Sequence, residues 1–248
     1  MYRTPRYLPA GDRALSIELG DEISPETNRR VHSLTRAIEA RGISGVVDLV
    51  PTYRALLVYY DPLTLSLAEL KERLAGVEQT AEQVAPGTAR VVEIPALYGG
   101  EYGPDLEFVA DHSGLSQEEV VRVHAGTDYL IYGMGFTPGF AYLGGMSERI
   151  ATPRLQTPRT LIPAGSVGIA ERQTGVYPIA SPGGWRLIGR TPVQLFDAGR
   201  DPPVLAGPGD YVRFVPLTEE AYREVERQVQ TEAYQVTIYD KDQGPGNH

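Results

Sequence analysis

The sequence predicts two domains: a ferredoxin-like α+β domain at residues 1–87, and a mainly β barrel or sandwich with a short helical insert at residues 88–248. Strand and helix patterns alternate in the first part. From about residue 97 onward, short β patterns separated by Gly and Pro dominate the second. The composition agrees with this division, since 248 residues of which 42% are hydrophobic can bury one large core or two small ones.

The first domain has the element order βαββαβ, which is typical of a ferredoxin-like α+β sandwich. Its first helix begins at Ser24 followed by Pro25 and ends at Gly42, and a capping box at residues 66–69 begins the second helix. Residues 83–88, with adjacent Pro and Gly, form the predicted linker. The predicted elements are a strand at 14–19, a helix at 24–42, strands at 46–50 and 54–60, a helix at 66–77, and a last strand at 90–96 near the boundary.

The second domain opens with two short helices and continues as a series of short strands. Gly114 separates the helices, and a capping box that starts at Ser116 begins the second. The frequent Gly and Pro residues that follow leave room only for short strands, which favours an all-β barrel or sandwich. The predicted elements are helices at 105–112 and 116–125, strands at 129–132, 166–170, 176–179, 185–188, 193–196 and 211–215, a helix at 218–229, a strand at 235–239, and a frayed tail at 243–248.

The composition also excludes several classes of protein. The chain has no Cys, so disulfides, thiolate catalysis and Cys-bound metals are excluded. Neither of its two lysines, Lys71 and Lys241, follows a Gly, so a P-loop for phosphate binding is absent. The longest apolar run has six residues, 55–60, which is too short to span a membrane. A net charge of −9 argues against binding to a nucleic-acid backbone. Because the first residues lack an apolar signal-type stretch, we expect a cytoplasmic protein.

The first segment that could carry chemistry is GMGFTPGFAYLGG, residues 133–145. Its glycine spacing does not fit a dinucleotide-binding loop, and no amphipathic helix follows it. Pro138 and Gly139 instead fit the central positions of a type II turn. Such a turn would present Phe136, Phe140 and Tyr142, and we expect Phe136, Pro138, Gly139 and Tyr142 to shape a pocket. The alternative is a hairpin whose aromatic side chains belong to the core.

Arginines are concentrated in the segments that follow. Between residues 149 and 190 there are six Arg and one Glu, a local charge of +5 in a protein of charge −9. The Arg guanidinium matches carboxylates and phosphates, so a small anionic substrate or an acidic partner is expected here. The candidates for anion binding are Arg154, Arg159 and Arg190. The alternative is that these arginines are solvated or paired with acids elsewhere in the fold.

A third segment, SPGGWRLIGRTP at residues 181–192, contains the only tryptophan of the chain. Paired glycines allow a backbone to approach a ligand closely and leave amide N–H groups free for an anion. Gly183, Gly184 and Trp185 are therefore candidates for a binding loop or a subunit interface. The alternative is a tight turn followed by a core anchor.

Of the four histidines, His124 alone immediately precedes the Gly-rich and aromatic segments, which makes it the candidate proton carrier. The alternative is a helix cap or a packed residue. The spacings typical of metal ligands are absent, so we expect no metal site on this chain.

In these segments the sequence resembles the KipI-like family, also known as the B subunit of 5-oxoprolinase or allophanate hydrolase subunit 1. The matching stretches are YGGEYGPDL at 98–106, GFTPGFAYLGG at 135–145, TPRLQTPRTLIPAGSVGIA at 152–170 and QTGVYPIASPGGWRLIGRTP at 173–192. The resemblance implies a ferredoxin-like N-terminal domain and a cyclophilin-like β-barrel C-terminal domain. Related domains form the carboxyltransferase part of urea carboxylase.

The resemblance also implies partners and a reaction. A KipA-like partner, which is the C subunit of 5-oxoprolinase, and a third protein, the A subunit, complete the ATP-dependent cleavage of 5-oxoproline to glutamate. Because this chain has no P-loop, we expect ATP to bind a partner or a shared interface, and the chain to be inactive alone. The carboxylate of 5-oxoproline fits the local excess of Arg.

Two other functions are open from the sequence. The KipI name implies a regulatory protein that binds and inhibits a sensor histidine kinase, with exposed aromatic and Pro-rich loops docking on a helical domain. Prolyl isomerase activity follows only from the analogy of a cyclophilin-like barrel, which is a weak basis for function.

Overall fold

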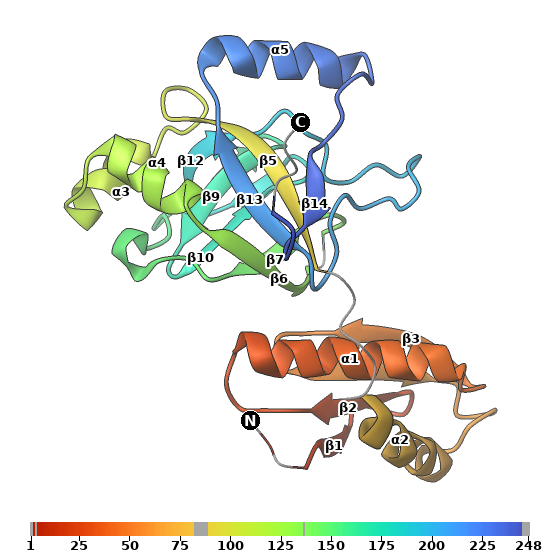
Figure 1. Cartoon of the computed structure of the whole chain (residues 1–248). Helices are drawn as coiled ribbons and strands as arrows, with labels where there is room; N and C mark the ends of the chain where they lie inside the picture. Colours follow the sequence, from red (N-terminus) through yellow and green to blue (C-terminus); the bar gives the residue numbers. More distant parts are fainter. Residues whose placement is uncertain (1, 3, 82–88, 136, 245–248) are drawn as a thin grey trace. The chain divides into compact units, whose positions relative to one another are not determined.

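The computed structural model describes residues 2, 4–81, 89–135 and 137–244, and the chain divides into two compact units, residues 1–88 and 89–248 (Figure 1). The predicted linker at 83–88 lies outside the described residues. None of the helices in the described ranges is long and apolar enough to cross a membrane.

Unit 1 is a four-stranded antiparallel sheet with two helices on one face. The sheet order is β1-β2-β4-β3, and the buried residues Leu15, Ile17, Leu56 and Val58 alternate along β2 and β4, so they share the face that α1 and α2 cover. The elements are β1 (Arg6–Pro9), β2 (Ala14–Glu18), α1 (Pro25–Arg41), β3 (Val46–Pro51), β4 (Ala55–Tyr60) and α2 (Leu67–Ala81).

The helix ends of unit 1 confirm the predicted caps. The Ser24 hydroxyl accepts a hydrogen bond from the Thr27 N–H, and Gly42 ends α1 in the left-handed conformation with φ 54°. Ser66 and Glu69 form the reciprocal bonds of a capping box at the start of α2.

The strand predicted at 90–96 belongs to the other unit, which corrects the expected βαββαβ order of the first domain. This strand, β5 (Arg90–Tyr98), pairs with strands of unit 2, and its place beside β2 is taken by β1, a strand that was not predicted. The burial of β5 explains the difference, because five of its nine residues are buried without strict alternation. Such a strand suits the interior of a barrel better than the edge of a half-exposed sheet.

Unit 2 is a closed β-barrel. Its strand order is β12-β9-β10-β7-β6-β13-β5, and pairing between β12 and β5 closes the ring. The end of β5 at Leu97 and Tyr98 pairs with β12, whereas its start pairs with the short C-terminal strand β14. The strands are β5 (Arg90–Tyr98), β6 (Asp128–Met134), β7 (Ala141–Gly144), β8 (Arg159–Ile162), β9 (Ser166–Ala170), β10 (Gln173–Val176), β11 (Ser181–Gly183), β12 (Arg186–Arg190), β13 (Tyr211–Pro216) and β14 (Ile238–Asp240).

Some predicted strands of unit 2 differ from the observed ones. No strand covers 193–196, where Phe196 makes only an isolated bridge with Val204, and the strand predicted at 176–179 is β10, which ends at Val176. The strands β7 and β11 were not predicted. Each has only three or four residues and lies beside Pro or Gly, so its pattern is too short to be recognised.

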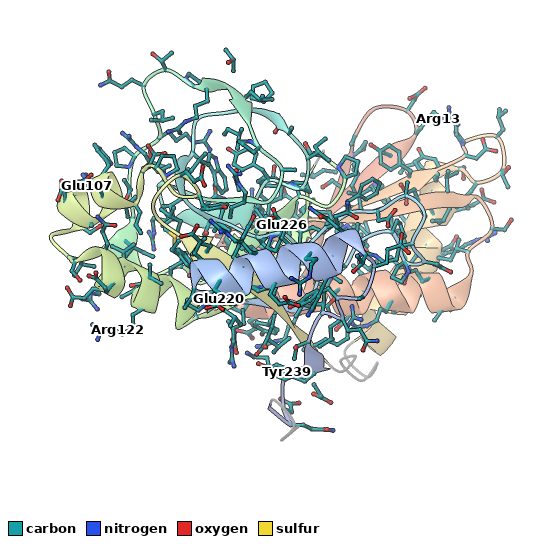
Figure 2. All side chains as sticks on the ribbon, turned by 90° about the horizontal axis from the view of Figure 1, so that it is seen from above. Arg13, Glu107, Arg122, Glu220, Glu226 and Tyr239 are labelled. Carbon is teal, nitrogen blue, oxygen red and sulfur yellow. The ribbon has the colours of Figure 1, made fainter. Side chains whose placement is uncertain are left out.

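Helices lie around the barrel. Figure 2 shows α3 and α4 together, carrying Glu107 and Arg122, whereas α5 carries Glu220 and Glu226. The capping box that starts at Ser116 is present, and Gly114 ends α3 with φ 64°, as predicted. The helices are α3 (Leu106–Ser113), α4 (Gln117–Ala125), the short 3-10 helix η1 (Glu148–Ile150) and α5 (Glu219–Gln230).

The barrel interior is filled by side chains. Its core includes Ile94, Ile131, Val167 and Phe214, each almost completely buried. A cavity of about 20 Å³ between Ile94, Ile131 and neighbouring apolar residues is large enough for a single water molecule. A metabolite therefore needs a site outside this cavity.

Candidate functional site

The three sequence segments singled out above converge on one cluster of aromatic rings, which we call the Trp185 cluster. It contains Phe140, Tyr177 and Trp185, whose ring centroids lie 5.8 to 6.1 Å apart in edge-to-face pairs. Tyr142 extends it, with its ring centroid 5.7 Å from that of Phe140. Such edge-to-face pairs are the favoured geometry of aromatic contacts. Segments far apart in sequence thus build one cluster of rings, in which Tyr177 and Trp185 are buried and Phe140 is partly buried, as the core alternative expects.

The predicted type II turn holds Phe140 in this cluster. The Phe140 N–H donates to the Thr137 carbonyl at 2.9 Å, and Gly139 has φ 79°. A side chain at Gly139 would also meet the Cβ of Phe196 at 2.7 Å, so glycine is required there for two reasons. Pro138 is exposed on the same turn, and Phe136 lies outside the described residues.

The two adjacent glycines before Trp185 have different surroundings. A Cβ on Gly183 would lie 2.4 Å from the hydroxyl oxygen of Tyr177, whereas a Cβ on Gly184 would find its nearest neighbour, in Pro158, at 3.7 Å. At Gly183, therefore, the Tyr177 hydroxyl leaves no room for a side chain. A Cβ added to Gly168 or Gly175 would likewise lie close to the Trp185 side chain, at 3.2 and 3.3 Å respectively.

Arg159 flanks the cluster and is held by Asp105. Its guanidinium donates to Asp105 Oδ1 at 3.0 Å and to the Trp185 carbonyl at 3.4 Å, and a second nitrogen lies 2.9 Å from Asp105 Oδ2. The side chain of Asp105 is 9% exposed and that of Arg159 is 29% exposed. The predicted anion-binding residue is thus a partly buried arginine with an acidic partner.

Arg154 is exposed, and no hydrogen bond or ion pair connects it to the rest of the described chain. Its charge and that of Arg159 both act on the Tyr177 phenol. Burial nevertheless raises the pKa of Tyr177 above its ordinary value, so the hydroxyl stays protonated at neutral pH and can donate a hydrogen bond. Arg154, Arg159 and Tyr177 together offer donors suited to a carboxylate.

Arg190 lies away from the Trp185 cluster. It lies five residues after Trp185 along β12, roughly 16 Å for an extended strand. Its guanidinium carbon lies 5.4 Å from the ring centroid of Tyr102, and the Tyr102 ring in turn contacts Tyr222 of α5. The structure therefore does not bring the three predicted arginines together.

His124 is completely buried in the barrel core, in a group of residues that we call the His124 network. Its Nδ1 lies 2.8 Å from the Tyr98 hydroxyl and its Nε2 lies 2.8 Å from the Thr174 hydroxyl, which itself donates to the Gly168 carbonyl. Because the Thr174 hydrogen is used in that bond, Nε2 of His124 donates to Thr174 and Nδ1 accepts from Tyr98. Burial lowers the pKa of His124 to about 3. The imidazole is therefore neutral at physiological pH and has no free nitrogen, which matches the packed-residue alternative.

An open groove of about 640 Å³ lies beside α4, where Tyr98 and Pro216 form part of its wall. Its single arginine, Arg122, is in an ion pair with Glu119 of the same helix. The groove therefore offers a weaker anion site than the Trp185 cluster. Within the described ranges, no three His, Cys, Asp or Glu side chains gather as metal ligands would.

Asp105, Phe140 and Tyr177 are site residues that were not predicted from the sequence. All three occur in the quoted stretches, but none was proposed for the site. An Asp placed immediately before a helix indicates a cap, and a Tyr between Val and Pro indicates core. Only the folded chain brings them to the cluster, where Asp105 bonds Arg159 and the Phe140 ring contacts that of Tyr177.

Comparison with known proteins defines the class to which this chain belongs. The family described as carboxyltransferase domain, subdomain C and D, matches residues 5–206, and the chain belongs to that family. The chain is similar to the 5-oxoprolinase B subunit of Bacillus subtilis (strain 168), with 45% identity over 226 residues, covering 86% of this chain and 92% of that protein.

Two solved structures are also similar. A conserved uncharacterized protein from Pyrococcus horikoshii is 53% identical, with a TM-score of 0.53 over 88% of this chain and 100% of that one. The Kluyveromyces lactis urea carboxylase is 21% identical, with a TM-score of 0.74 over 96% of this chain and 24% of that one, which shows a shared fold.

Proposed function

We propose that this chain is the B subunit of a 5-oxoprolinase, which acts with partner subunits in the ATP-dependent opening of 5-oxoproline to glutamate. The similarity to the Bacillus subtilis protein of that name over almost its whole length supports the assignment. The observation that carries the substrate class is the Trp185 cluster, where the exposed Arg154 and the remaining N–H groups of the Asp105-paired Arg159 adjoin aromatic rings.

The chemistry of the cluster suits a small cyclic acid. The carboxylate of 5-oxoproline accepts hydrogen bonds from Arg154, from the free N–H groups of Arg159 and from the protonated Tyr177 hydroxyl. The lactam ring packs against the partly buried ring of Phe140 at the edge of the cluster. Holding the substrate in this way orients its amide bond for a group supplied by a partner protein.

ATP is used by the complex and is bound by a partner or at a shared interface. Lys241 supports that division, since it is paired with Asp128 at 2.9 Å and lies against the Tyr211 ring. The proposed partners are the A subunit and the KipA-like C subunit, and the proposed location is the cytoplasm. Unit 2 is proposed to be cyclophilin-like, and unit 1 to be a ferredoxin-like variant in which β1 replaces the expected last strand.

Co-purification with the A and C subunits, followed by an assay of ATP-dependent 5-oxoproline hydrolysis, tests the proposal. We expect activity from the complex and none from the chain alone. Full activity of the isolated chain, or an inactive complex, would contradict it. Neither the kinase-inhibitor nor the prolyl isomerase alternative is proposed, because no observation favours either of them.

A further inference from the structure

Asp105 occupies the first position before α3, where an Asp side chain ordinarily caps the helix. Its side chain makes no capping hydrogen bond to the helix. The start of α3 therefore lacks the stabilisation that such a cap supplies. The carboxylate of Asp105 is therefore available for contacts outside the helix.

The Asp105 carboxylate is turned instead toward β12 and β8. Its Oδ2 accepts the Leu187 N–H at 2.7 Å, while the Asp105 N–H donates to the Leu187 carbonyl at 2.9 Å. These two hydrogen bonds hold the Asp105 carboxylate beside Leu187, which follows Trp185 by two residues. The fixed carboxylate then receives two nitrogens of Arg159, and Arg186 approaches it at 3.9 Å.

Arg159 keeps donor capacity in this arrangement. A guanidinium has five N–H groups. Within the described part of the chain, Arg159 directs two of them at Asp105 and one at the Trp185 carbonyl, which leaves two. Asp105 neutralises only one of the positive charges of Arg154, Arg159 and Arg186, so the cluster keeps a positive charge beside its rings.

We propose that Asp105 is a positioning residue that orients the Arg159 guanidinium beside Trp185, so that its remaining N–H groups bind the carboxylate of a small cyclic acid. The identity of this ligand rests on the proposed function. The orientation by Asp105 rests on the contacts of Asp105, Arg159 and Leu187 alone.

The single tryptophan of the chain gives a direct test, because its fluorescence reports on this cluster only. The full chain is titrated with 5-oxoproline, with acetate as a simpler carboxylate and with 2-pyrrolidinone as a ring that lacks the carboxylate. The variants are Asp105→Asn, which keeps an acceptor for Leu187, Arg159→Lys, which keeps the charge without the planar fork, and the double variant. Asp128→Asn is the control, because Asp128 holds Arg213 in an equivalent bidentate pair elsewhere on the barrel.

We expect each single variant to weaken carboxylate binding about 10-fold or more, and the double variant to add little, because both changes remove one interaction. Asp128→Asn leaves the affinity for carboxylates unchanged, and every variant binds 2-pyrrolidinone as the wild type does. In the complex with the A and C subunits, Asp105→Asn raises KM for 5-oxoproline about 10-fold with kcat little changed.

Three results would overturn the positioning role: wild-type affinity for both carboxylates in Asp105→Asn, independent multiplying effects of the two substitutions, or no carboxylate binding to the wild-type chain. Failure of the proposed function is a separate result, namely a complex that does not hydrolyse 5-oxoproline. In that case the acetate titration alone decides the role of Asp105.

Discussion

The His124 network and the Trp185 cluster both combine aromatic rings with hydrogen-bonding groups inside unit 2, but they differ in how completely those groups are used. The rings of Tyr98, Tyr129 and Phe214 surround His124 with centroid distances of 4.6 to 5.7 Å, and both imidazole nitrogens are bonded. In the Trp185 cluster, Arg154 has no protein partner in the described ranges and Arg159 keeps free N–H groups.

This difference separates a structural centre from the proposed binding site. Buried polar groups in a stable core are satisfied by one another, because each unsatisfied group costs free energy. A ligand site instead keeps donors that only the ligand completes. The unused donors, more than the presence of a titratable His, therefore support the proposed site.

The largest effect is expected from emptying the His124 network. His124→Ala leaves Tyr98 and Thr174 without their partner and creates a cavity, so we expect the free energy of unfolding to fall by about 4 kcal/mol. Urea unfolding, followed by Trp185 fluorescence, measures it. His124→Gln retains hydrogen-bonding groups and should lose less. Equal stability of His124→Ala and wild type would show that the network does not hold the core.

Arg154→Ala should weaken substrate binding and leave the free energy of unfolding almost unchanged. Removing a charge-assisted hydrogen bond to the substrate carboxylate costs about 1.5 to 3 kcal/mol of binding free energy. Titration of Trp185 fluorescence with 5-oxoproline measures the affinity. Arg172→Ala is the control, because Arg172 is an exposed arginine paired with Glu148. A wild-type affinity in Arg154→Ala would remove Arg154 from the site.

Much of the local structure of the two units could be predicted from the sequence. The caps at Ser24 and Ser116, the turn at Pro138 and Gly139, and most long strands follow from residue types at fixed spacings. The segments that form the Trp185 cluster were also recognised, through their Gly, Pro, Arg and aromatic residues.

Which residues meet could not be predicted, because that depends on strand pairing. Arg154 and Arg159 were grouped with Arg190, but β12 carries Arg190 along the barrel to Tyr102. The partner of Arg159 lies 54 residues earlier in the chain, and nothing local to either residue indicates the pair. Likewise, the sheet to which β5 belongs is decided by long-range pairing with β13.

The two adjacent glycines give a sharper test of the Trp185 cluster. Gly183→Ala forces the Tyr177 hydroxyl to move, because the new Cβ would lie 2.4 Å from it, and overpacking of this kind costs about 2 kcal/mol. We expect both stability and 5-oxoproline affinity to fall. Gly184→Ala is the matched control, with 3.7 Å to its nearest neighbour. Equal effects of the two substitutions would show that Tyr177 is not held by its contact with Gly183.

The smallest expected effect is a pH dependence that belongs to the His124 network alone. Burial lowers the pKa of His124 to about 3 in the folded state, whereas an unfolded His has a pKa of about 6.5. Between these values the unfolded chain binds one more proton than the folded chain, so stability falls as the pH is lowered. The expected loss is about 1.5 kcal/mol between pH 6.5 and 5.

Urea unfolding of wild type and His124→Gln across this range isolates the contribution of His124, because the other histidines and the carboxylates are common to both proteins. As the pH is lowered, His124→Gln should lose less free energy of unfolding than wild type. The difference is the contribution of the buried neutral imidazole of His124. Identical pH profiles would mean that His124 can be protonated in the folded state. It would then require a path to solvent, and its role as candidate proton carrier, which its closed hydrogen bonds argue against, would have to be considered again.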